Sequence, residues 1–243
     1  MRKRVKNKIL VTGSNGRFAA VMKKKYIKNK KYIFLDKKKL NILNKSSIRE
    51  NLIKYKPKMV IHLAALSRPM HLHYKNIQKS ISINIIGTSN LVIECSKLNI
   101  KLVHFSTQYV YPGLKGNYSE NSPLLPMNNY AWSKLGAECA VQIYKNSLIL
   151  RVAMIERPWT YNYAYNNVKS NYLYHDEVAK LLPKLLSKKG IINIGSNSNS
   201  IVKFARRTKK NVKTARFFQK KNEPKTPINS SMNISNLKKI IRS

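Results

Sequence analysis

"KILVTGSNGRFA", residues 8–19, sets a short apolar run directly before two glycines and the start of an amphipathic segment. The apolar run, 8–12, predicts a buried strand, and 17–25 predicts a helix. Gly13 permits the tight turn between them, and Gly16 lets the backbone come close to a ligand. A strand, a glycine turn and a helix in this order predict the beginning of a parallel α/β sheet.

The same alternation continues along the chain. Further strands are expected at 32–36, 59–65, 101–106 and 147–153, and further helices at 46–55, 78–98 and 129–145. Continuous apolar strands separated by helices indicate a parallel sheet covered on both faces. We therefore predict a doubly wound parallel α/β fold of the Rossmann type.

One helix start can be read more closely. Ser46 followed by Glu50 suits the first turn of the helix at 46–55. Ile48, Leu52 and Ile53 supply its apolar stripe.

The pattern weakens after about residue 155. Residues 172–186 read as a strand that runs into a helix, 190–196 reads as another short strand, and 203–228 is rich in lysine without a clear assignment. We expect a dinucleotide-binding domain at 1–155. A reduced substrate-binding region at 156–243 would be partly interleaved with its sheet.

The charge is extreme, with 48 Lys and Arg against 9 Asp and Glu, a formal net charge of +39. Such a field attracts polyanions. The lysines are nevertheless scattered along the chain, without the basic and aromatic signature of an RNA-binding module. We expect solvated lysines and no dedicated nucleic-acid function, although a nucleotide-bearing small substrate would benefit from the field.

The cysteines and the apolar runs bear on location. Cys95 and Cys139 lack metal or redox spacing, so we expect a reduced protein without a metal site. The basic start has no apolar core of a signal peptide, and no run approaches membrane-spanning length. These features predict a cytoplasmic protein without a membrane partner.

The glycine turn predicts a cofactor. Gly13, Gly16 and Ala19 follow the first strand in the order that brings a pyrophosphate to a helix N-terminus. Asp36 ends the second strand, where an acid binds the adenosine ribose hydroxyls. Lys37 and the two lysines after it could instead bind a 2′-phosphate, so the choice between NADH and NADPH stays open.

Tyr130 and Lys134 lie four residues apart at the start of an expected helix, hence on one face. A phenol has a reference pKa of about 10, and lowering it by ~3 units requires roughly 4 kcal/mol. An ammonium at about 4 Å supplies energy of that order at an effective dielectric near 20. Thr107 ends the fourth strand at the same carboxyl edge of the sheet, where its hydroxyl could bind a substrate carbonyl.

Five segments together carry a family resemblance. They are "LNILNKSSIRENLIKYKPKMVIHLAA" (40–65), "SINIIGTSNLV" (82–92), "STQYVYPG" (106–113), "ENSPLLPMNNYAWSKLGAE" (120–138) and "INSSMNISNLKK" (228–239). With the glycine turn they resemble, in the same order, the extended short-chain dehydrogenases/reductases of the sugar-nucleotide type. The form of 106–113 is most similar to that of the dTDP-4-dehydrorhamnose reductases.

The resemblance implies roles for particular residues. Thr107, Tyr130 and Lys134 would be the catalytic set, supported by Asn84 and Ser106. The cofactor-binding set would be Gly13, Asn15, Gly16, Arg17, Phe18, Asp36, Lys37, Asn41, Ala64, Ala65, Tyr130 and Lys134. Asn41 replaces an aspartate that the family has near adenine.

The substrate region departs most from the family. The segment between the fifth strand and residue 172 is much shorter than in the family, which normally builds a substrate lid there. Gln108, where the reductases usually have Asp, together with Tyr109, Arg157 and Trp159 are the substrate candidates. The aromatic residues Trp159, Tyr161, Tyr163 and Tyr165 could stack on a base or sugar, or form the core of a reduced domain.

The function implied is NADH- or NADPH-dependent reduction of a keto-sugar nucleotide, in the synthesis of deoxysugars for surface polysaccharides. One alternative is an epimerase on the same scaffold. Another is a dinucleotide-binding scaffold or regulatory protein without turnover. By analogy with the family, helices 78–98 and 129–145 would form a homodimer.

Overall fold

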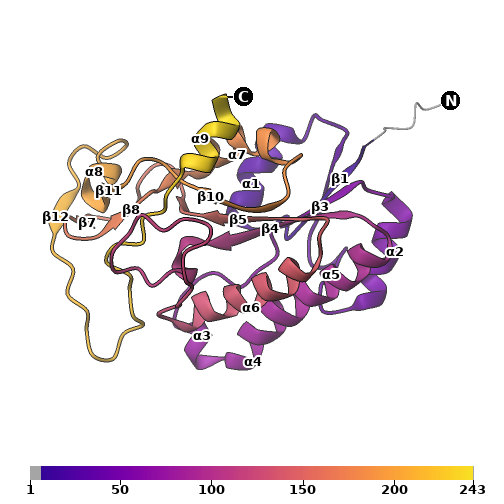
Figure 1. Ribbon diagram of the computed structural model, residues 1–243, viewed down its shortest axis with the longest axis horizontal. Helices are drawn as coiled ribbons and strands as arrows, with labels where there is room; N and C mark the ends of the chain where they lie inside the picture. The colour runs from indigo at the N-terminus through magenta and orange to yellow at the C-terminus, as the bar shows by residue number, and fades with distance from the viewer. Residues whose placement is uncertain (1–6, 243) are drawn as a thin grey trace. The chain divides into compact units, whose positions relative to one another are not determined.

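The computed structural model describes residues 7–242 (Figure 1). The chain divides into two compact units and passes between them repeatedly. The first unit comprises Met1–Phe105, Ser133–Ile149 and Leu186–Gly190, and the second comprises Ser106–Trp132, Leu150–Leu185 and Ile191–Ser243. The expected division into domains at residue 155 is a statement about function and stays a prediction.

The main sheet has six strands in the order β10-β5-β4-β3-β1-β2. These strands are β1 (Ile9–Thr12), β2 (Tyr32–Leu35), β3 (Met59–His62), β4 (Lys101–Thr107), β5 (Ser147–Val152) and β10 (Gly190–Ile194). β2, β1, β3 and β4 pair in parallel, with Ile9 opposite both Tyr32 and Met59. The predicted strands and the parallel sheet are confirmed.

The third strand is shorter than the sequence predicts. It ends at His62, whereas the apolar run continues to Ala65. The backbone N–H groups of Leu63 and Ala64 turn toward the side-chain oxygen of Thr12, at 3.2 and 3.3 Å. These N–H groups therefore leave the sheet, and the strand stops.

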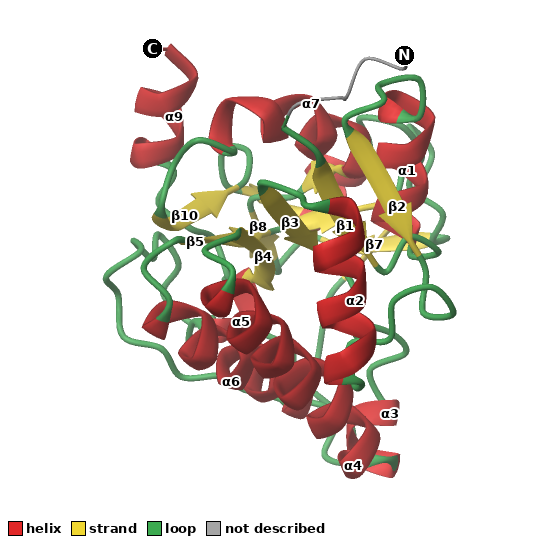
Figure 2. Cartoon of the chain, turned by 90° about the vertical axis from the view of Figure 1, so that its right-hand side faces the viewer, coloured by secondary structure: helices red, strands yellow, loops and turns green. Residues whose placement is uncertain are grey.

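Helices cover both faces of this sheet. The helices that precede β5 are α1 (Arg17–Tyr26), α2 (Lys45–Tyr55), α3 (Leu72–Lys75), α4 (Ile77–Ser80), a π-helix η1 (Ile81–Ile86), α5 (Gly87–Lys97) and α6 (Asn129–Ile143). Figures 1 and 2 show α1 on one side of β1 and β3, and α2 with α5 on the other. The doubly wound α/β fold is confirmed.

α2 begins one residue earlier than the sequence predicts. The helix begins at Lys45, and its cap is Asn44, whose side chain accepts a hydrogen bond from the backbone N–H of Ser47 at 3.0 Å. Asn is a strong N-cap residue because its short side chain reaches that otherwise unpaired donor. Of the predicted apolar stripe, Ile48 and Leu52 are buried, but Ile53 is exposed.

The single helix predicted at 78–98 is a composite. It runs through α4, the π-helix η1 and α5 without a loop. The sequence contains no signal for the π segment. Short π segments inside helices are rare and frequently lie at functional sites.

The core of the first unit forms where helices meet strands. β1, β3 and β4 contribute side chains that are fully buried, and the helices cover them. Examples are Leu10, Val11, Val60, Ile61, Leu102 and Val103 from the strands, with Met22, Ile48, Leu52 and Leu91 from the helices. Burial of a side chain of this size contributes about 1.5–3 kcal/mol, so this packing is the main source of stability.

The second unit is built from short elements. They are the 3-10 helix η2 (Gln108–Val110), β6 (Met154–Ile155), β7 (Tyr163–Tyr165), β8 (Lys169–Ser170), β9 (Leu173–Tyr174), α7 (His175–Leu185), β11 (Asn199–Ser200), α8 (Ile201–Ala205), β12 (Lys213–Ala215) and α9 (Ser235–Arg242). Three small two-stranded sheets pair β11 with β8, β12 with β7 and β6 with β9. The strand and helix predicted at 172–186 correspond to β9 and α7.

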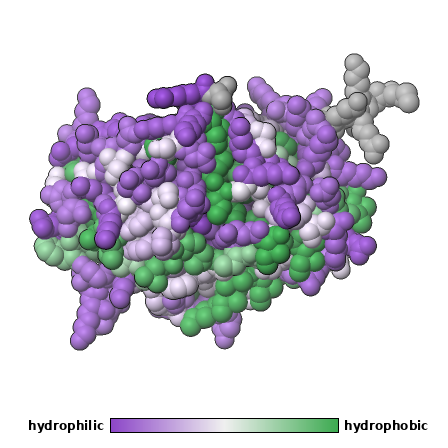
Figure 3. Space-filling model, viewed as in Figure 1, coloured by the Kyte–Doolittle hydropathy of each residue, from purple (hydrophilic) through white to green (hydrophobic). Residues whose placement is uncertain are grey.

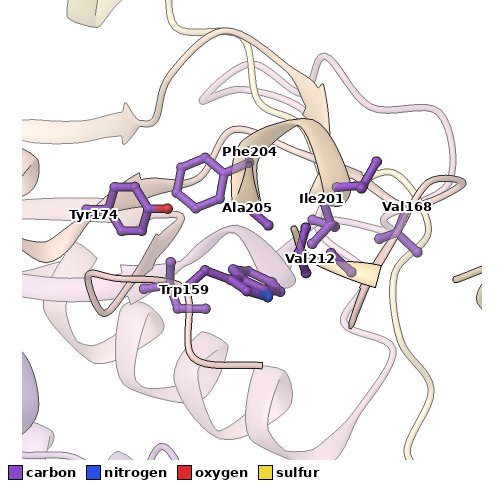
Figure 4. Close-up of a cluster of buried hydrophobic side chains, with 10 residues drawn as sticks. Trp159, Val168, Tyr174, Ile201, Phe204, Ala205 and Val212 are labelled. Carbon is purple, nitrogen blue, oxygen red and sulfur yellow. The ribbon is translucent and has the colours of Figure 1, made fainter. Parts of the chain in front are cut away.

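An apolar cluster holds part of this unit together (Figure 4). Trp159 lies in it, 7% exposed, and the rings of Tyr174 and Phe204 face each other at 4.6 Å between centroids. Tyr161 and Tyr163 are about half exposed at its edge. Of the two alternatives for the aromatic segment, Trp159 therefore fits the second, because it belongs to the apolar core of this unit.

Hydrophilic side chains cover much of the visible face (Figure 3), as scattered lysines would. Across residues 7–242, each helix is either too short or too polar to cross a bilayer.

Candidate functional site

The glycine turn is built as the sequence predicts. Gly13 has a φ of +66°, and a Cβ there would lie 2.5 Å from the backbone N and Cα of Ala64. The N–H of Gly16 donates to the carbonyl of Gly13 at 2.9 Å, and α1 begins at Arg17 without a side-chain cap. The turn thus leads into a helix N-terminus of the kind that binds phosphate groups.

A chain of buried polar groups lies directly beneath this turn. His62, at the end of β3, is fully buried, with Nδ1 2.9 Å from the hydroxyl of Thr12 and Nε2 3.0 Å from the hydroxyl of Thr88. Thr88 donates its one hydroxyl proton to the carbonyl of Asn84 at 2.7 Å. Thr88 must therefore accept from Nε2–H of His62.

The protons of this chain can all be assigned. Because the proton of His62 is on Nε2, Nδ1 accepts from the Thr12 hydroxyl. The Thr12 oxygen in turn accepts from the N–H groups of Leu63 and Ala64. A neutral imidazole satisfies every member, and burial, assisted by the positive charge of Lys134, lowers the pKa of His62 to about 3.

Asn84 ties the π-helix to the surrounding loop and to α6. Its Oδ1 accepts from the N–H of Leu66 at 2.8 Å, and its Nδ2 donates to the carbonyl of the same residue at 2.9 Å. Nδ2 also donates to the hydroxyl of Ser133 at 2.8 Å. The side chain is 1% exposed, so these bonds hold the residue directly before Lys134 in a dry setting.

Lys134 is a buried cation, 4% exposed. Its Nζ lies 3.2 Å from Nε2 of His104, which is in the middle of β4 and fully buried. Burial lowers the pKa of Lys134 to about 8, and the negative charge of Glu138, one helical turn further on, opposes that shift. The ammonium is therefore close to its protonation midpoint at neutral pH, as is typical of functional lysines.

The other two predicted catalytic residues belong to the second unit. Tyr130 is half-buried in the first turn of α6, four positions before Lys134, so the two side chains share a helix face. Thr107, at the end of β4, is buried, and its hydroxyl accepts from the N–H of Tyr109 at 3.2 Å. The hydroxyl of Ser106 is buried with no hydrogen-bond partner among residues 7–242.

The adenosine-side candidates are half-buried or exposed. Oδ1 of Asp36 accepts from the N–H of Lys39 at 3.1 Å, which leaves the other carboxylate oxygen for a ribose hydroxyl. Lys37 is exposed. Oδ1 of Asn41 accepts from the N–H of Leu43 at 3.1 Å. A carboxylate and an ammonium therefore follow the second strand, and either form of the dinucleotide could be held.

Two of the substrate candidates form hydrogen bonds inside the second unit. Gln108 is 2% exposed, and its Oε1 accepts from the hydroxyl of Ser170 at 2.9 Å. The hydroxyls of Tyr109 and Tyr172 are 3.1 Å apart. Gln108, which stands where the family usually has Asp, is thus engaged in the packing of this unit.

Arg157 belongs to a charged cluster. Its Nε donates to Asp176 at 2.9 Å, and its guanidinium lies 4.2 Å from the ring centre of Tyr174. Burial opposes ionisation of Asp176, but the bond and charge of Arg157 outweigh it and lower the pKa of that carboxyl. Glu177 lies 3.5 Å from the same guanidinium. Arg157 is therefore neutralised within its own unit.

Three buried ionisable residues that interact with Lys134 were not predicted from the sequence: His62, His104 and Glu138. Both histidines stand inside apolar strands, in "MVIHLAA" and "KLVHFS". A titratable residue within a buried strand was the available signal. Across residues 7–242, no three His, Cys, Asp or Glu side chains gather as a metal site would require.

The sequence profile described as RmlD substrate binding domain matches residues 7–177. The spore coat polysaccharide biosynthesis protein SpsK of Bacillus subtilis (strain 168) is 33% identical over 165 residues, 66% of this chain and 56% of the relative. A dTDP-4-dehydrorhamnose reductase of Aggregatibacter actinomycetemcomitans is 29% identical over 67% of this chain and 55% of its own. The matches thus span little more than half the length of these relatives.

A solved structure supports the fold independently. It is a dTDP-4-dehydrorhamnose reductase of Bacillus anthracis in complex with NADP, with a TM-score of 0.83 and 22% identity. The superposition covers 96% of this chain and 91% of the other. The resemblance read from the sequence motifs is confirmed, and the chain belongs to the RmlD substrate binding domain family.

Proposed function

We propose that this chain is an NADH- or NADPH-dependent reductase of a keto-sugar nucleotide, acting in the synthesis of deoxysugars for surface polysaccharides. The observation that carries the proposal is the buried Lys134, with a pKa near 8, on the same helix face as Tyr130. Family membership and the glycine turn support it. The relatives named a dTDP-4-dehydrorhamnose reductase and a spore coat polysaccharide protein indicate the class of substrate.

In this proposal a bound nicotinamide supplies hydride to the carbonyl carbon. Thr107 would hold the carbonyl oxygen by its hydroxyl, and Tyr130 would give the proton to that oxygen. Lys134 would stabilise the phenolate that remains. Asn84, through Ser133, would keep the start of the helix in place.

The residues of the glycine turn fit a dinucleotide. Gly13 adopts a φ of +66°, which brings the turn against Ala64. The N-cap residue of α1 is Gly16, so no side chain occupies the helix N-terminus. Gly16, Arg17 and Phe18 would meet the pyrophosphate there. Asp36 or Lys37 would meet the adenosine ribose or its 2′-phosphate.

The decisive experiment mixes the protein with dTDP-4-keto-6-deoxy sugars and either NADH or NADPH, and follows loss of absorbance by the reduced cofactor. Tyr130→Phe should lower turnover by roughly 10²–10⁴-fold, the usual contribution of a positioned proton donor. Cofactor affinity, measured by fluorescence titration, should stay within about twofold. Tyr55→Phe removes a hydroxyl from the end of α2 and serves as the control.

The other outcomes point elsewhere. Turnover unchanged in Tyr130→Phe would refute the assigned role of that phenol. Conversion of the sugar without net loss of reduced cofactor would indicate an epimerase. Cofactor binding without turnover across the sugar panel would indicate a scaffold or regulatory protein.

We also propose a homodimer formed through the helices at 78–98 (α4, η1 and α5) and 129–145 (α6). Ile86 in η1, Ile93 in α5 and Ile143 in α6 expose apolar side chains, which supports this arrangement. Sedimentation velocity at several protein concentrations would test it. Cytoplasmic location and the lack of a nucleic-acid partner stay predictions from the sequence.

A further inference from the structure

β4 carries an ionisable side chain where an apolar one is expected. All seven residues of this strand are buried, and His104 lies in its middle with no exposed surface. An isolated buried imidazole contributes little that Leu or Phe could not. Its presence is explained by a contact with Lys134, whose Nζ lies 3.2 Å from Nε2 of His104.

The direction of this hydrogen bond follows from the donors. An ammonium has three N–H donors and no acceptor, so Nε2 of His104 must accept when Lys134 is charged. The imidazole is then neutral, with its proton on Nδ1. Burial, together with the charge of Lys134 and the proximity of His62, lowers the pKa of His104 well below its ordinary value, which is consistent with a neutral ring.

The groups that face Lys134 come from three elements. His104 is on β4, and His62, 5.5 Å from it between ring centroids, is on β3. Glu138 is one turn further along α6, and it is fully buried. Since His62 accepts from Thr12 and donates to Thr88, its nitrogens are already committed. Among these groups, the neutral imidazole of His104 makes the hydrogen bond to the ammonium.

We propose that His104 is a positioning residue for the proposed reductase: through Nε2 it holds the ammonium of Lys134, a residue of the catalytic helix α6, and keeps it charged. This inference rests on the proposed function for its catalytic meaning. The contact between His104 and Lys134 does not depend on the proposed function, because it is a feature of the fold: both side chains lie in the first unit, 3.2 Å apart. His104 touches no reacting group, so it would act through Lys134.

The competing explanation is that His104 only fills space in the core. The two explanations differ in what happens to Lys134 when the acceptor is removed. If His104 is an acceptor, its loss leaves the ammonium buried without that bond, and the pKa of Lys134 must fall further. If His104 is only packing, an apolar side chain of similar size should leave that pKa unchanged.

The experiment measures the protonation of Lys134 directly, in the full chain without cofactor or substrate. Lysine labelled with ¹³C at Cε reports protonation by NMR, and the signal that titrates near pH 8 and is lost in Lys134→Met is that of Lys134. In His104→Leu we expect its midpoint to fall by about 1 to 2 units, the size of one lost hydrogen bond to a charged group. His104→Gln places an amide oxygen near the former Nε2 and should restore the midpoint to within about half a unit.

His73→Leu is the matched control. His73 is also fully buried in the first unit, but Nδ1 of its ring contacts the hydroxyl of Ser80 at 2.7 Å. The control loses a buried histidine of the same size and should leave the Lys134 midpoint unchanged. Circular dichroism of each variant confirms that it is folded. If His104→Leu is not folded, His104→Met carries the test, because its flexible apolar side chain fills the space without an acceptor comparable to Nε2.

Kinetics give the second readout. A midpoint lowered from about 8 to about 6.5 reduces the charged fraction of Lys134 at pH 7 from about nine-tenths to about a quarter. The kcat of His104→Leu should then fall about fourfold, while the KM for the sugar nucleotide stays unchanged because His104 is fully buried. His104→Gln should recover most of the kcat.

The outcomes separate the two proposals. A Lys134 midpoint that is the same in His104→Leu as in the unaltered protein overturns the inference, whatever the protein catalyses. A midpoint that falls in a protein with no reductase activity on any sugar in the panel overturns the proposed function, and the positioning role with it. A lowered midpoint together with a lowered kcat, both restored by His104→Gln, supports the inference.

Discussion

Acid should destabilise this protein through His62 in particular. The ring is fully buried, accepts from the Thr12 hydroxyl and donates to Thr88, so it has no place for a second proton. Protonation of His62 would place two hydrogen-bond donors, Nδ1–H and the Thr12 hydroxyl, opposite each other without an acceptor between them. The unfolded chain accepts the proton freely, and lowering the pH from 7 to 5 therefore favours unfolding.

The magnitude follows from the pKa. Burial lowers the pKa of His62 from 6.5 to about 3 in the folded protein. Between these values the unfolded state binds more protons, so this contribution to stability is complete above about pH 6.5 and declines as the pH falls toward 3. One unit corresponds to 1.36 kcal/mol, so the loss between pH 7 and pH 5 is about 2 kcal/mol.

The assay compares urea unfolding of the wild-type chain and His62→Gln at pH 7 and pH 5. Glutamine does not titrate, so only the wild-type chain loses this contribution at the lower pH. The difference in free energy of unfolding between the two proteins should therefore be about 2 kcal/mol smaller at pH 5 than at pH 7. The contributions of His104 and of the carboxylates are present in both proteins and cancel. His71→Gln, an exposed histidine changed in the same way, is the control.

A gap between wild type and His62→Gln that is equal at both pH values would refute the reasoning. It would mean that His62 takes up its proton as readily in the folded protein as in the unfolded chain. The assigned proton positions, from Thr12 through His62 to Thr88, would then be wrong.

Two further substitutions test the glycine turn and the buried cation. Gly13→Ala should destabilise the fold by more than about 2 kcal/mol and abolish cofactor binding, because the residue has a φ of +66° and its Cβ would lie 2.5 Å from the backbone of Ala64. Thermal unfolding and fluorescence titration measure the two effects, and Ala20→Ser, at an exposed position of α1, is the control that keeps the turn. Lys134→Met should abolish reduction yet raise stability at pH 7 by about 1–3 kcal/mol, since the folded protein lowers the pKa of this lysine from 10.5 to about 8. The gain should shrink toward pH 10, where the wild-type lysine is neutral in the folded state, and a variant less stable than wild type at pH 7 would contradict it.

The sheet was predictable from local pattern alone. The strands at 8–12, 32–36 and 101–106 are short apolar runs bounded by polar or glycine residues, and burial on both faces of a sheet requires little else of a sequence. Gly13 was predictable for a related reason. A turn with positive φ that presses against a neighbouring strand admits little besides glycine.

What escaped prediction depends on contacts distant in sequence. The π-helix at Ile81–Ile86 is a change of hydrogen-bond register inside a segment whose apolar pattern reads as an ordinary helix. The chain from Thr12 to His62 to Thr88 joins residues 50 and 26 positions apart. No local pattern contains those separations, so only the folded chain brings the hydroxyls to both sides of the ring.

The second unit was the hardest part to read for a physical reason. Its strands are two or three residues long, too short for an alternating pattern to be distinguished from chance. Trp159 illustrates the consequence, because an aromatic side chain in such a segment suits a binding surface and a core equally well. Its place against Phe204 was decided by α8, a five-residue helix that lies more than 40 positions later in the chain.

The buried polar groups of the first unit are best understood as a single arrangement that costs stability. Lys134 and His62 both have pKa values lowered by burial, so each makes the folded state less favourable over some range of pH. A core made for stability alone would replace them with apolar residues. The ring nitrogens of His62 and Nε2 of His104 nevertheless have defined partners, which fixes the end of β3 beneath the glycine turn and the side chain of Lys134 against β4. Proton transfer by a neighbouring phenol would require a cation that is held rigidly in this way. The buried cation lowers the stability of the protein, and the stability gained in Lys134→Met would reveal that cost.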